Sequence, residues 1–168
     1  MRSGVKQMAC PLCGRAGLLN CHGLVYGNGA AGNSRVLRGG RFLCSPRRKG
    51  DSGCGHSFTL WLAGCLPRHS VGTKGLWRFL RHYHSGLSVS AAWEKARTGF
   101  SIESAYRWVR RMYEIQSRLR ARLCRVRAPP PGTDAKNPLS EVLEHWFNAL
   151  GEDDPIRSFH LRFQTDLL

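Results

Sequence analysis

From residue 73 onward, apolar residues recur every three or four positions, a spacing that predicts amphipathic helices. The first predicted helix covers residues 73–85 and ends before Gly86. A second, short helix begins after the N-cap residue Ser88 and ends at Thr98-Gly99. A third begins after another cap residue, Ser101. The pattern therefore predicts a helix, a tight turn and another helix, which is the layout of a helix-turn-helix.

The third predicted helix is long, and its apolar residues form one continuous stripe. The stripe contains Ala105, Trp108, Val109, Met112, Ile115, Leu119, Leu123 and Val126. Such a stripe either packs within the chain, against the cysteine-rich N-terminal region or the first predicted helix, or forms the seam of a homodimer. We favour packing within the chain, because about two heptads are short for an independent coiled coil.

A proline run separates this region from the last part of the chain. The sequence Pro129-Pro-Pro-Gly-Thr-Asp134 cannot continue a helix, so we place a domain boundary there. Residues 140–150 then predict a further amphipathic helix that ends at Gly151. For residues 158–168 two interpretations stay open: a peptide that binds a partner protein, or a strand in which Phe159, Leu161 and Phe163 alternate.

The charge is unevenly divided between these parts. The chain of 168 residues has a net charge of +15, and residues 1–128 carry +19 while the remainder carries −4. Such an excess predicts a polyanionic partner, with nucleic acid favoured and a membrane surface as the weaker alternative. The longest apolar run, residues 58–66, is too short to cross a bilayer, so we expect a cytoplasmic, nucleoid-associated protein.

Cysteines near the N-terminus have the spacing of a metal site. Cys10 and Cys13 form a Cys-x-x-Cys-Gly turn, and Cys44 and Cys54 lie beyond a glycine-rich stretch. Four thiolates brought together in this way suit tetrahedral Zn²⁺ in a zinc ribbon, which would fold the N-terminus around the ion.

Other potential ligands lie nearby in the sequence. Cys21 or His56 could replace one member of the set, and His22 and Cys65 are also within reach. A metal-free N-terminus is the remaining alternative. For Cys65 and Cys124 we expect packing or idle thiols.

The arginines of the third helix are the candidate nucleic-acid contacts. Glu103, Ser104 and Arg107 lie near its N-terminal end, where side chains of this motif reach base edges. Further basic residues are expected to contact phosphates: Arg110 and Arg111 on the helix, and Arg47, Arg48 and Lys49 between the second pair of cysteines.

The cysteine pairs and the run Gly99-Phe-Ser-Ile-Glu-Ser-Ala-Tyr-Arg-Trp108 resemble the small zinc-ribbon plus helix-turn-helix proteins of bacterial insertion sequences and the N-terminal regions of related transposases. The resemblance covers residues 9–112 and implies binding to double-stranded DNA at element ends. The family usually keeps a two-residue gap in the second cysteine pair, whereas nine residues separate Cys44 from Cys54 here. The last five residues resemble peptides that bind the bacterial sliding clamp, which implies contacts by Gln164, Asp166, Leu167 and Leu168.

These features predict an α+β chain: a zinc ribbon over 1–68, a helix-turn-helix over 69–128, a linker over 129–138 and an acidic helix and tail over 139–168. No catalysis of its own is expected, because only four acids precede the proline run: Asp51, Glu94, Glu103 and Glu114. The expected function is sequence-specific DNA binding, with a sliding clamp or separate recombinase as possible protein partner. RNA binding is the second hypothesis, and a non-catalytic subunit of a nuclease or transposase assembly is the third.

Overall fold

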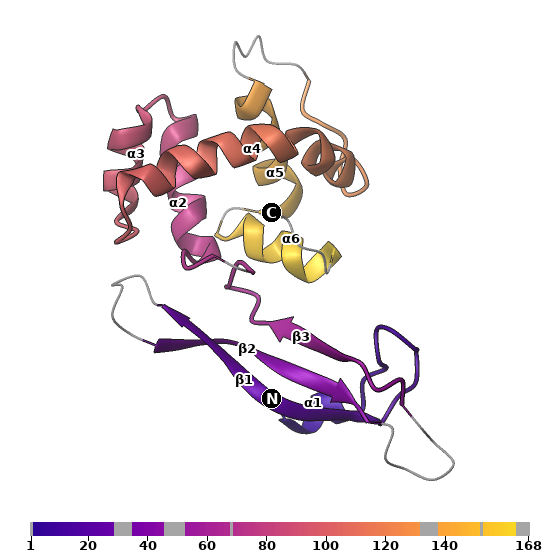
Figure 1. The fold of residues 1–168 in the computed structure, drawn as a ribbon. Coiled ribbons are helices and arrows are strands. Elements are labelled where there is room, and N and C mark those ends of the chain that lie inside the picture. Colours follow the sequence, from indigo (N-terminus) through magenta and orange to yellow (C-terminus); the bar gives the residue numbers. More distant parts are fainter. Residues whose placement is uncertain are drawn as a thin grey trace. The chain divides into compact units, whose positions relative to one another are not determined.

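The computed structural model describes residues 2–28, 35–45, 53–67, 69–131, 138–151 and 153–163. These residues form two compact units, a sheet unit that ends at Leu62 and a helical unit that begins at Ala63. The sheet unit contains a three-stranded antiparallel sheet and one short helix, and the helical unit contains five described helices (Figure 1). The α+β class expected from the sequence is confirmed.

The sheet unit is built on one long hairpin. Helix α1 (Arg2–Lys6) precedes strands β1 (Leu19–Asn28), β2 (Arg35–Cys44) and β3 (Ser57–Trp61), which lie in the order β1-β2-β3. The register places Phe42 opposite Cys21 on β1 and opposite Phe58 on β3. A small core lies on one side of the sheet and contains Val5, Cys10, Leu18, Leu19, Phe42 and Cys44. Two of the candidate metal ligands are therefore part of the core.

The first three helices of the helical unit follow the predicted pattern. They are α2 (Thr73–His84), α3 (Val89–Ala96) and α4 (Ile102–Leu123). The Ser88 side chain accepts a hydrogen bond from the backbone N–H of Ala91, which confirms the predicted cap. Ser101 occupies the N-cap position of α4, but its side chain makes no capping bond.

The turn between α3 and α4 is fixed by other contacts. Arg97 ends α3 in the left-handed conformation, with φ 48°, and its backbone N–H donates to the carbonyl of Glu94. The indole N–H of Trp93 donates to the carbonyl of Phe100 at 2.9 Å. Because Trp93 is buried in the core, this bond ties the turn to the packed side of α3.

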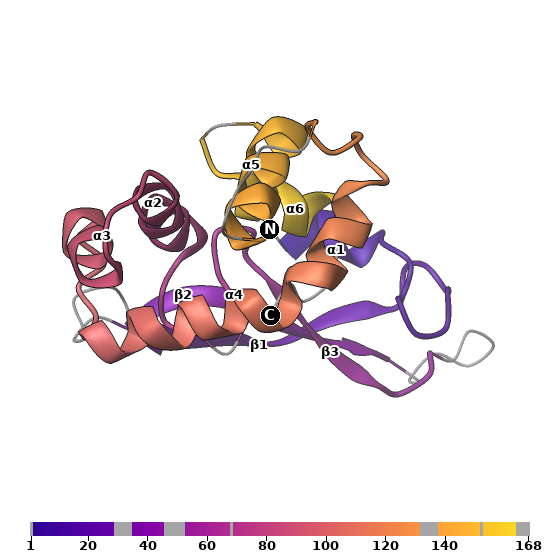
Figure 2. The same ribbon diagram turned by 90° about the horizontal axis from the view of Figure 1, so that it is seen from above.

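The apolar stripe of α4 is covered within the chain, as favoured from the sequence. Met112, Ile115, Leu119 and Leu123 are at most 2% exposed. The helix that packs along this part of α4 is α5 (Pro138–Leu150), rather than the first predicted helix, α2 (Figure 2).

The acidic C-terminal part shares the core of the preceding helices instead of standing apart beyond the linker. Trp146 on α5 and Phe159 on α6 (Pro155–Phe163) are fully buried in the cluster that contains Trp77, Trp93 and Met112. The Thr73 hydroxyl at the start of α2 donates to an Asp154 carboxylate oxygen at 2.7 Å. Charge composition does not reveal this packing, because the apolar faces of α5 and α6 decide it.

The strand considered for Phe159, Leu161 and Phe163 is wrong, because these residues lie on α6. Asp154 accepts a hydrogen bond from the backbone N–H of Arg157, and Pro155 is the first helical residue, so the segment begins as a capped helix. In the part of the chain that the structure describes, no helix combines the length and apolar character needed to cross a membrane.

Candidate metal centre and basic helix surface

The side chains of Cys10, Cys13, Cys44 and Cys54 converge at one end of the sheet unit. Their sulfur atoms all lie within 4.8 Å of one another. The distance between the sulfurs of Cys10 and Cys54 is 3.9 Å, and that between Cys13 and Cys44 is 3.8 Å. These distances are far longer than a disulfide bond, and all four are free thiols. The cluster could hold a metal ion.

Two glycine-containing turns aim the sulfurs at the common centre. In the first, the backbone N–H of Gly14 donates to the Cys10 carbonyl, and Gly14 has φ 73°. The backbone N–H of Leu12 points at the Cys10 sulfur at 3.4 Å. In the second, the backbone N–H of Gly55 donates to the Cys44 carbonyl, and Gly55 has φ 74°.

The nine residues between Cys44 and Cys54 do not separate the two thiols. The backbone N–H of Gly53 donates to the Ser45 carbonyl at 2.9 Å, which closes the insertion at its base. A Cβ atom at Gly53 would lie 2.6 Å from the Cys44 sulfur. The close approach of backbone to sulfur therefore requires glycine at this position.

The thiols differ in their ease of ionisation. A hydrogen bond from the Arg15 backbone lowers the pKa of Cys13 to about 7. Burial raises the pKa of Cys44 to about 12. A metal ion bound here must therefore displace protons from the cluster, Cys44 above all.

The alternative ligands lie outside the cluster. Cys21 is exposed on β1, where its thiol lies 3.8 Å from the Gly23 carbonyl. His56 Nδ1 lies 3.0 Å from the Cys54 carbonyl oxygen, so this ring contacts the second turn without joining the four sulfurs. Cys65 and Cys124 belong to the helical unit.

The predicted base-reading residues lie together at the start of α4. Glu103 and Arg107 are exposed and Ser104 is half-buried, while Ala105 and Trp108 turn inward to the core. A hydrogen bond with the Ser101 side chain lowers the pKa of Glu103, so its carboxylate is kept ionised. The Arg107 side chain donates to the Glu103 carbonyl at 3.4 Å.

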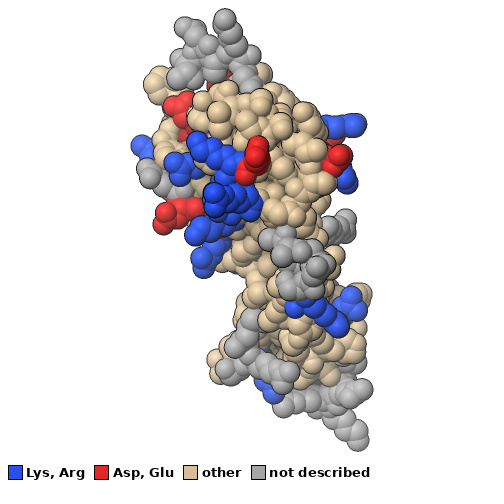
Figure 3. Space-filling view, turned by 90° about the vertical axis from the view of Figure 1, so that its left-hand side faces the viewer, with Lys and Arg blue, Asp and Glu red and all other residues tan. Residues whose placement is uncertain are grey.

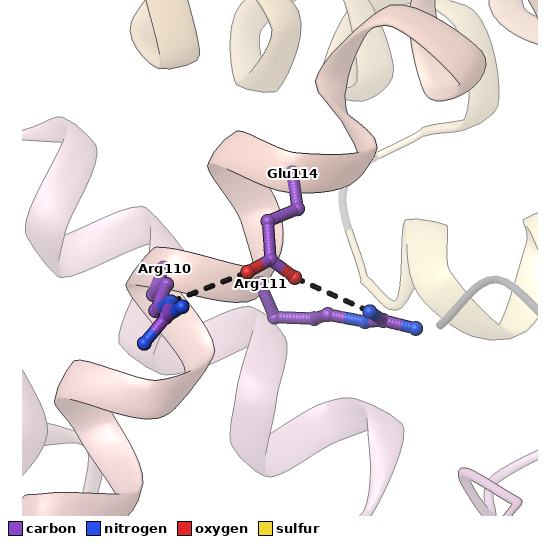
Figure 4. Close-up of polar contacts among 3 residues, drawn as sticks. All are labelled: Arg110, Arg111 and Glu114. Atoms are coloured by element: carbon purple, nitrogen blue, oxygen red, sulfur yellow. Dashed lines mark hydrogen bonds and ion pairs between the residues drawn. The ribbon is translucent and has the colours of Figure 1, made fainter.

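One turn further along, a single carboxylate joins the two predicted phosphate contacts. Glu114 accepts a hydrogen bond from Arg110 on one oxygen and from Arg111 on the other, each at 3.2 Å (Figure 4). Both arginines are exposed, so these ion pairs contribute little to stability. Their effect is to hold two guanidinium groups side by side on the outer surface of α4.

Basic side chains gather on one face of the helical unit, with few acidic ones among them (Figure 3). A further basic group lies on α2 and α3 and was not predicted from the sequence. His82 on α2 has a lowered pKa because of its partial burial and the nearby positive charges of Lys95, Arg81 and Arg78. Helical spacing could have revealed the α2 part of this group, since Arg81 and His82 follow Arg78 by three and four residues.

Two sets of predicted contacts lie outside the described residues. They are Arg47, Arg48 and Lys49 in the cysteine insertion, and Gln164, Asp166, Leu167 and Leu168 at the C-terminus. Comparisons with protein-family models, with curated proteins and with solved structures found no match to this chain.

Proposed function

We propose that this chain is a sequence-specific double-stranded DNA-binding protein of a mobile genetic element, with a structural zinc ribbon and a helix-turn-helix made by α3 and α4. It would act as a regulator or as an accessory factor in transposition or recombination. The observation that carries the proposal is the construction of α4, whose inner face is buried in the core while its outer face displays Arg107, Arg110 and Arg111.

The proposal of zinc rests on the spacing of the four sulfurs. A tetrahedral ion with Zn–S bonds of about 2.3 Å separates its ligands by about 3.8 Å. The two measured pairs, at 3.8 and 3.9 Å, already have this separation. All four ligands are cysteines, which is typical of closed structural sites with no position left for a substrate.

The proposed recognition helix has the means to read bases and to contact the backbone. Arg107 can donate two hydrogen bonds to guanine, and Glu103 can accept one from cytosine. Arg110 and Arg111, fixed by Glu114, lie further along the same helix and suit phosphate contacts. A groove-reading helix with flanking phosphate contacts is the usual arrangement of this motif.

Catalysis is not part of the proposal. Within the described residues no three carboxylates lie together in a metal-binding group. In the described part of the chain before residue 132, the acids are Glu94, Glu103 and Glu114, all on helices α3 and α4. A two-metal nuclease site needs several converging carboxylates. Recombination would then require a separate enzyme, and the C-terminal peptide is proposed to recruit a partner such as the sliding clamp.

The test is binding of the zinc-loaded full-length protein to a random pool of duplex DNA and to structured RNA, measured by fluorescence anisotropy over a salt series. Duplexes retained at raised salt are then sequenced. We expect one enriched motif that Arg107→Ala abolishes. The matched variant Arg118→Ala, also exposed on α4, should weaken binding to all sequences without changing the motif.

Two results would count against the proposal. Equal, salt-sensitive binding to every polyanion, with no enriched motif, would leave only nonspecific nucleic-acid binding. Tighter binding to structured RNA than to duplex DNA would favour the RNA-binding hypothesis.

A further inference from the structure

The proposed recognition helix carries an exposed aromatic side chain that the proposed function does not use. Tyr106 on α4 is 57% exposed, which makes it the most exposed aromatic residue in the part of the chain that the structure describes. It makes no hydrogen bond or ring contact with any of these described residues. Packing within the chain therefore gives no reason for an aromatic side chain here, and the ring is available to a ligand.

Tyr106 lies on the same face of α4 as the residues proposed to contact DNA. It follows Glu103 by three residues and precedes Arg110 by four, so these side chains are neighbours on the helix surface. Arg107 follows Glu103 by four residues and borders the same face. Ala105, by contrast, is fully buried on the inner side of the helix. Tyr106 therefore lies on the outer side of α4, among the charged residues.

The charged neighbours of Tyr106 turn away from its ring. Nε of Arg107 donates to the Glu103 carbonyl at 3.4 Å, toward the start of the helix. Nε of Arg110 donates to a Glu114 carboxylate oxygen at 3.2 Å, one turn further on (Figure 4). Apolar ring surface is therefore left uncovered between groups that form hydrogen bonds.

Apolar surface at this position limits which base edge it can favour. Thymine is the base that presents a methyl group in the major groove of DNA, on C5, beside the hydrogen-bonding groups of the other bases. An aromatic ring against this methyl group buries apolar surface on both sides, which cytosine in the same place would not provide. Residues 103–110 span about 10 Å along the helix axis, which is about three base pairs of roughly 3.4 Å each. The thymine would therefore lie close to the guanine proposed to bind Arg107.

We propose that Tyr106 contacts the C5-methyl group of a thymine in the recognised duplex and so makes the protein select thymine at that position. This inference rests on the proposed function, because it requires α4 to lie in the major groove. It adds an apolar base contact to the two polar ones proposed above, from arginine to guanine and from cytosine to glutamate. The motif enriched from the random pool should accordingly contain a fixed thymine.

The experiment takes the duplex selected by the full-length, zinc-loaded protein and replaces its thymines one at a time by deoxyuridine, which lacks only the methyl group. At one position this change should weaken binding by the wild-type protein about fourfold, the value for one buried methyl group, as measured by fluorescence anisotropy. The Tyr106→Ala protein should bind the thymine and deoxyuridine duplexes equally, and its affinity for the thymine duplex should fall by at least the same factor. Tyr106→Phe should keep the preference for thymine, because the ring makes the contact and the hydroxyl does not.

Tyr113→Ala is the matched control. It removes the same side chain from another exposed position of α4, about two turns away, and should keep the preference for thymine. Far-ultraviolet circular dichroism should show that both alanine variants fold, since neither ring belongs to the core.

The results separate this inference from the proposed function. If the wild-type protein bound the enriched motif equally well with thymine or deoxyuridine at every position, the thymine contact would be overturned while sequence-specific binding stood. A folded Tyr106→Ala protein that kept the preference for thymine would have the same meaning, because another group would then contact the methyl. The absence of any enriched motif would overturn both the thymine contact and the proposed function.

Discussion

Trp146→Phe tests whether helices α2, α3 and α4 depend on the C-terminal helices for their stability. Trp146 is fully buried on α5, its indole N–H donates to the Pro155 carbonyl at 3.1 Å, and its ring packs against Trp77 and Phe159. It therefore contacts both α2 and α6. We expect the substitution to destabilise the whole helical unit, including α4, whose proposed DNA-binding residues lie far away in the sequence.

The size of the effect follows from two losses. The Pro155 carbonyl would lose the indole donor but, as the first residue of α6, would keep its hydrogen bond within the helix, so this loss costs about 0.5–1.5 kcal/mol. The smaller ring leaves part of the site unfilled, which costs about 1 kcal/mol more. A destabilisation of about 1.5–2.5 kcal/mol in a unit of this size lowers Tm by roughly 6–15 °C.

The assay is thermal unfolding followed by circular dichroism at 222 nm, together with limited proteolysis that maps which helices open. Leu161→Ala is the control, because Leu161 lies on α6 but is 58% exposed, and it should change stability by no more than about 0.5 kcal/mol. If Trp146→Phe exposed only α5 and α6 to protease while the transition of the other helices stayed in place, the shared core would not be cooperative and the reasoning would fail.

Three further predictions concern the metal centre, the basic surface and pH. Gly53→Ala should weaken zinc binding by about tenfold or more, because its Cβ atom would lie 2.6 Å from the Cys44 sulfur; competition with a chromogenic chelator measures this. Glu114→Gln should steepen the salt dependence of duplex binding. The slope of log K against log salt concentration should grow by about 0.9 for each arginine that no longer pairs with residue 114 and gains a phosphate contact. His82→Gln should reduce the loss of stability on acidification. The lowered pKa of His82 means that the unfolded chain takes up this proton first, so stability declines as pH falls through the ordinary value of 6.5 toward the folded one.

Each of these predictions has a matched control. Gly23→Ala, at a glycine with open space around it, should leave zinc affinity unchanged, and equal affinities for both glycine variants would refute the steric argument. Glu144→Gln makes the same charge change on α5, so an identical slope for both glutamate variants would show that Glu114 has no special effect. Leu161→Ala, which removes no titratable group, should keep the pH profile of the wild type; a His82→Gln profile that also coincides with it would contradict the assigned cause.

Local patterns predicted the parts of this molecule that are held by local interactions. The cysteine spacing identified all four sulfurs of the cluster, because Cys-x-x-Cys-Gly specifies a turn geometry by itself. The cap at Ser88 and the apolar spacing of α2 and α3 identified those helices within about a residue.

The remaining packing could not be predicted, because it depends on contacts between residues far apart in sequence. Prolines and negative charge after residue 128 suggested a separate part, yet charge on the outside of α5 is compatible with Val142, Leu143 and Trp146 buried on its inside. Phe159, Leu161 and Phe163 alternate as in a strand, but the cap Asp154 followed by Pro155 was the stronger signal and indicated a helix start. The bond from Thr73 to Asp154 has no sequence signature.

The hydrogen bond from Thr73 to Asp154 also affects how the protein folds during its synthesis. A growing chain on the ribosome presents α2, α3 and α4 long before it presents Asp154 and α6, 81 residues after Thr73. The apolar stripe of α4 lacks its cover until α5 emerges, and the start of α2 lacks its carboxylate partner until Asp154 follows. Because non-local contacts must wait for the later residues, the helical unit completes its folding only when α6 has emerged. The proposed duplex binding would then require α6, and nascent or prematurely terminated chains would not compete for the same sites.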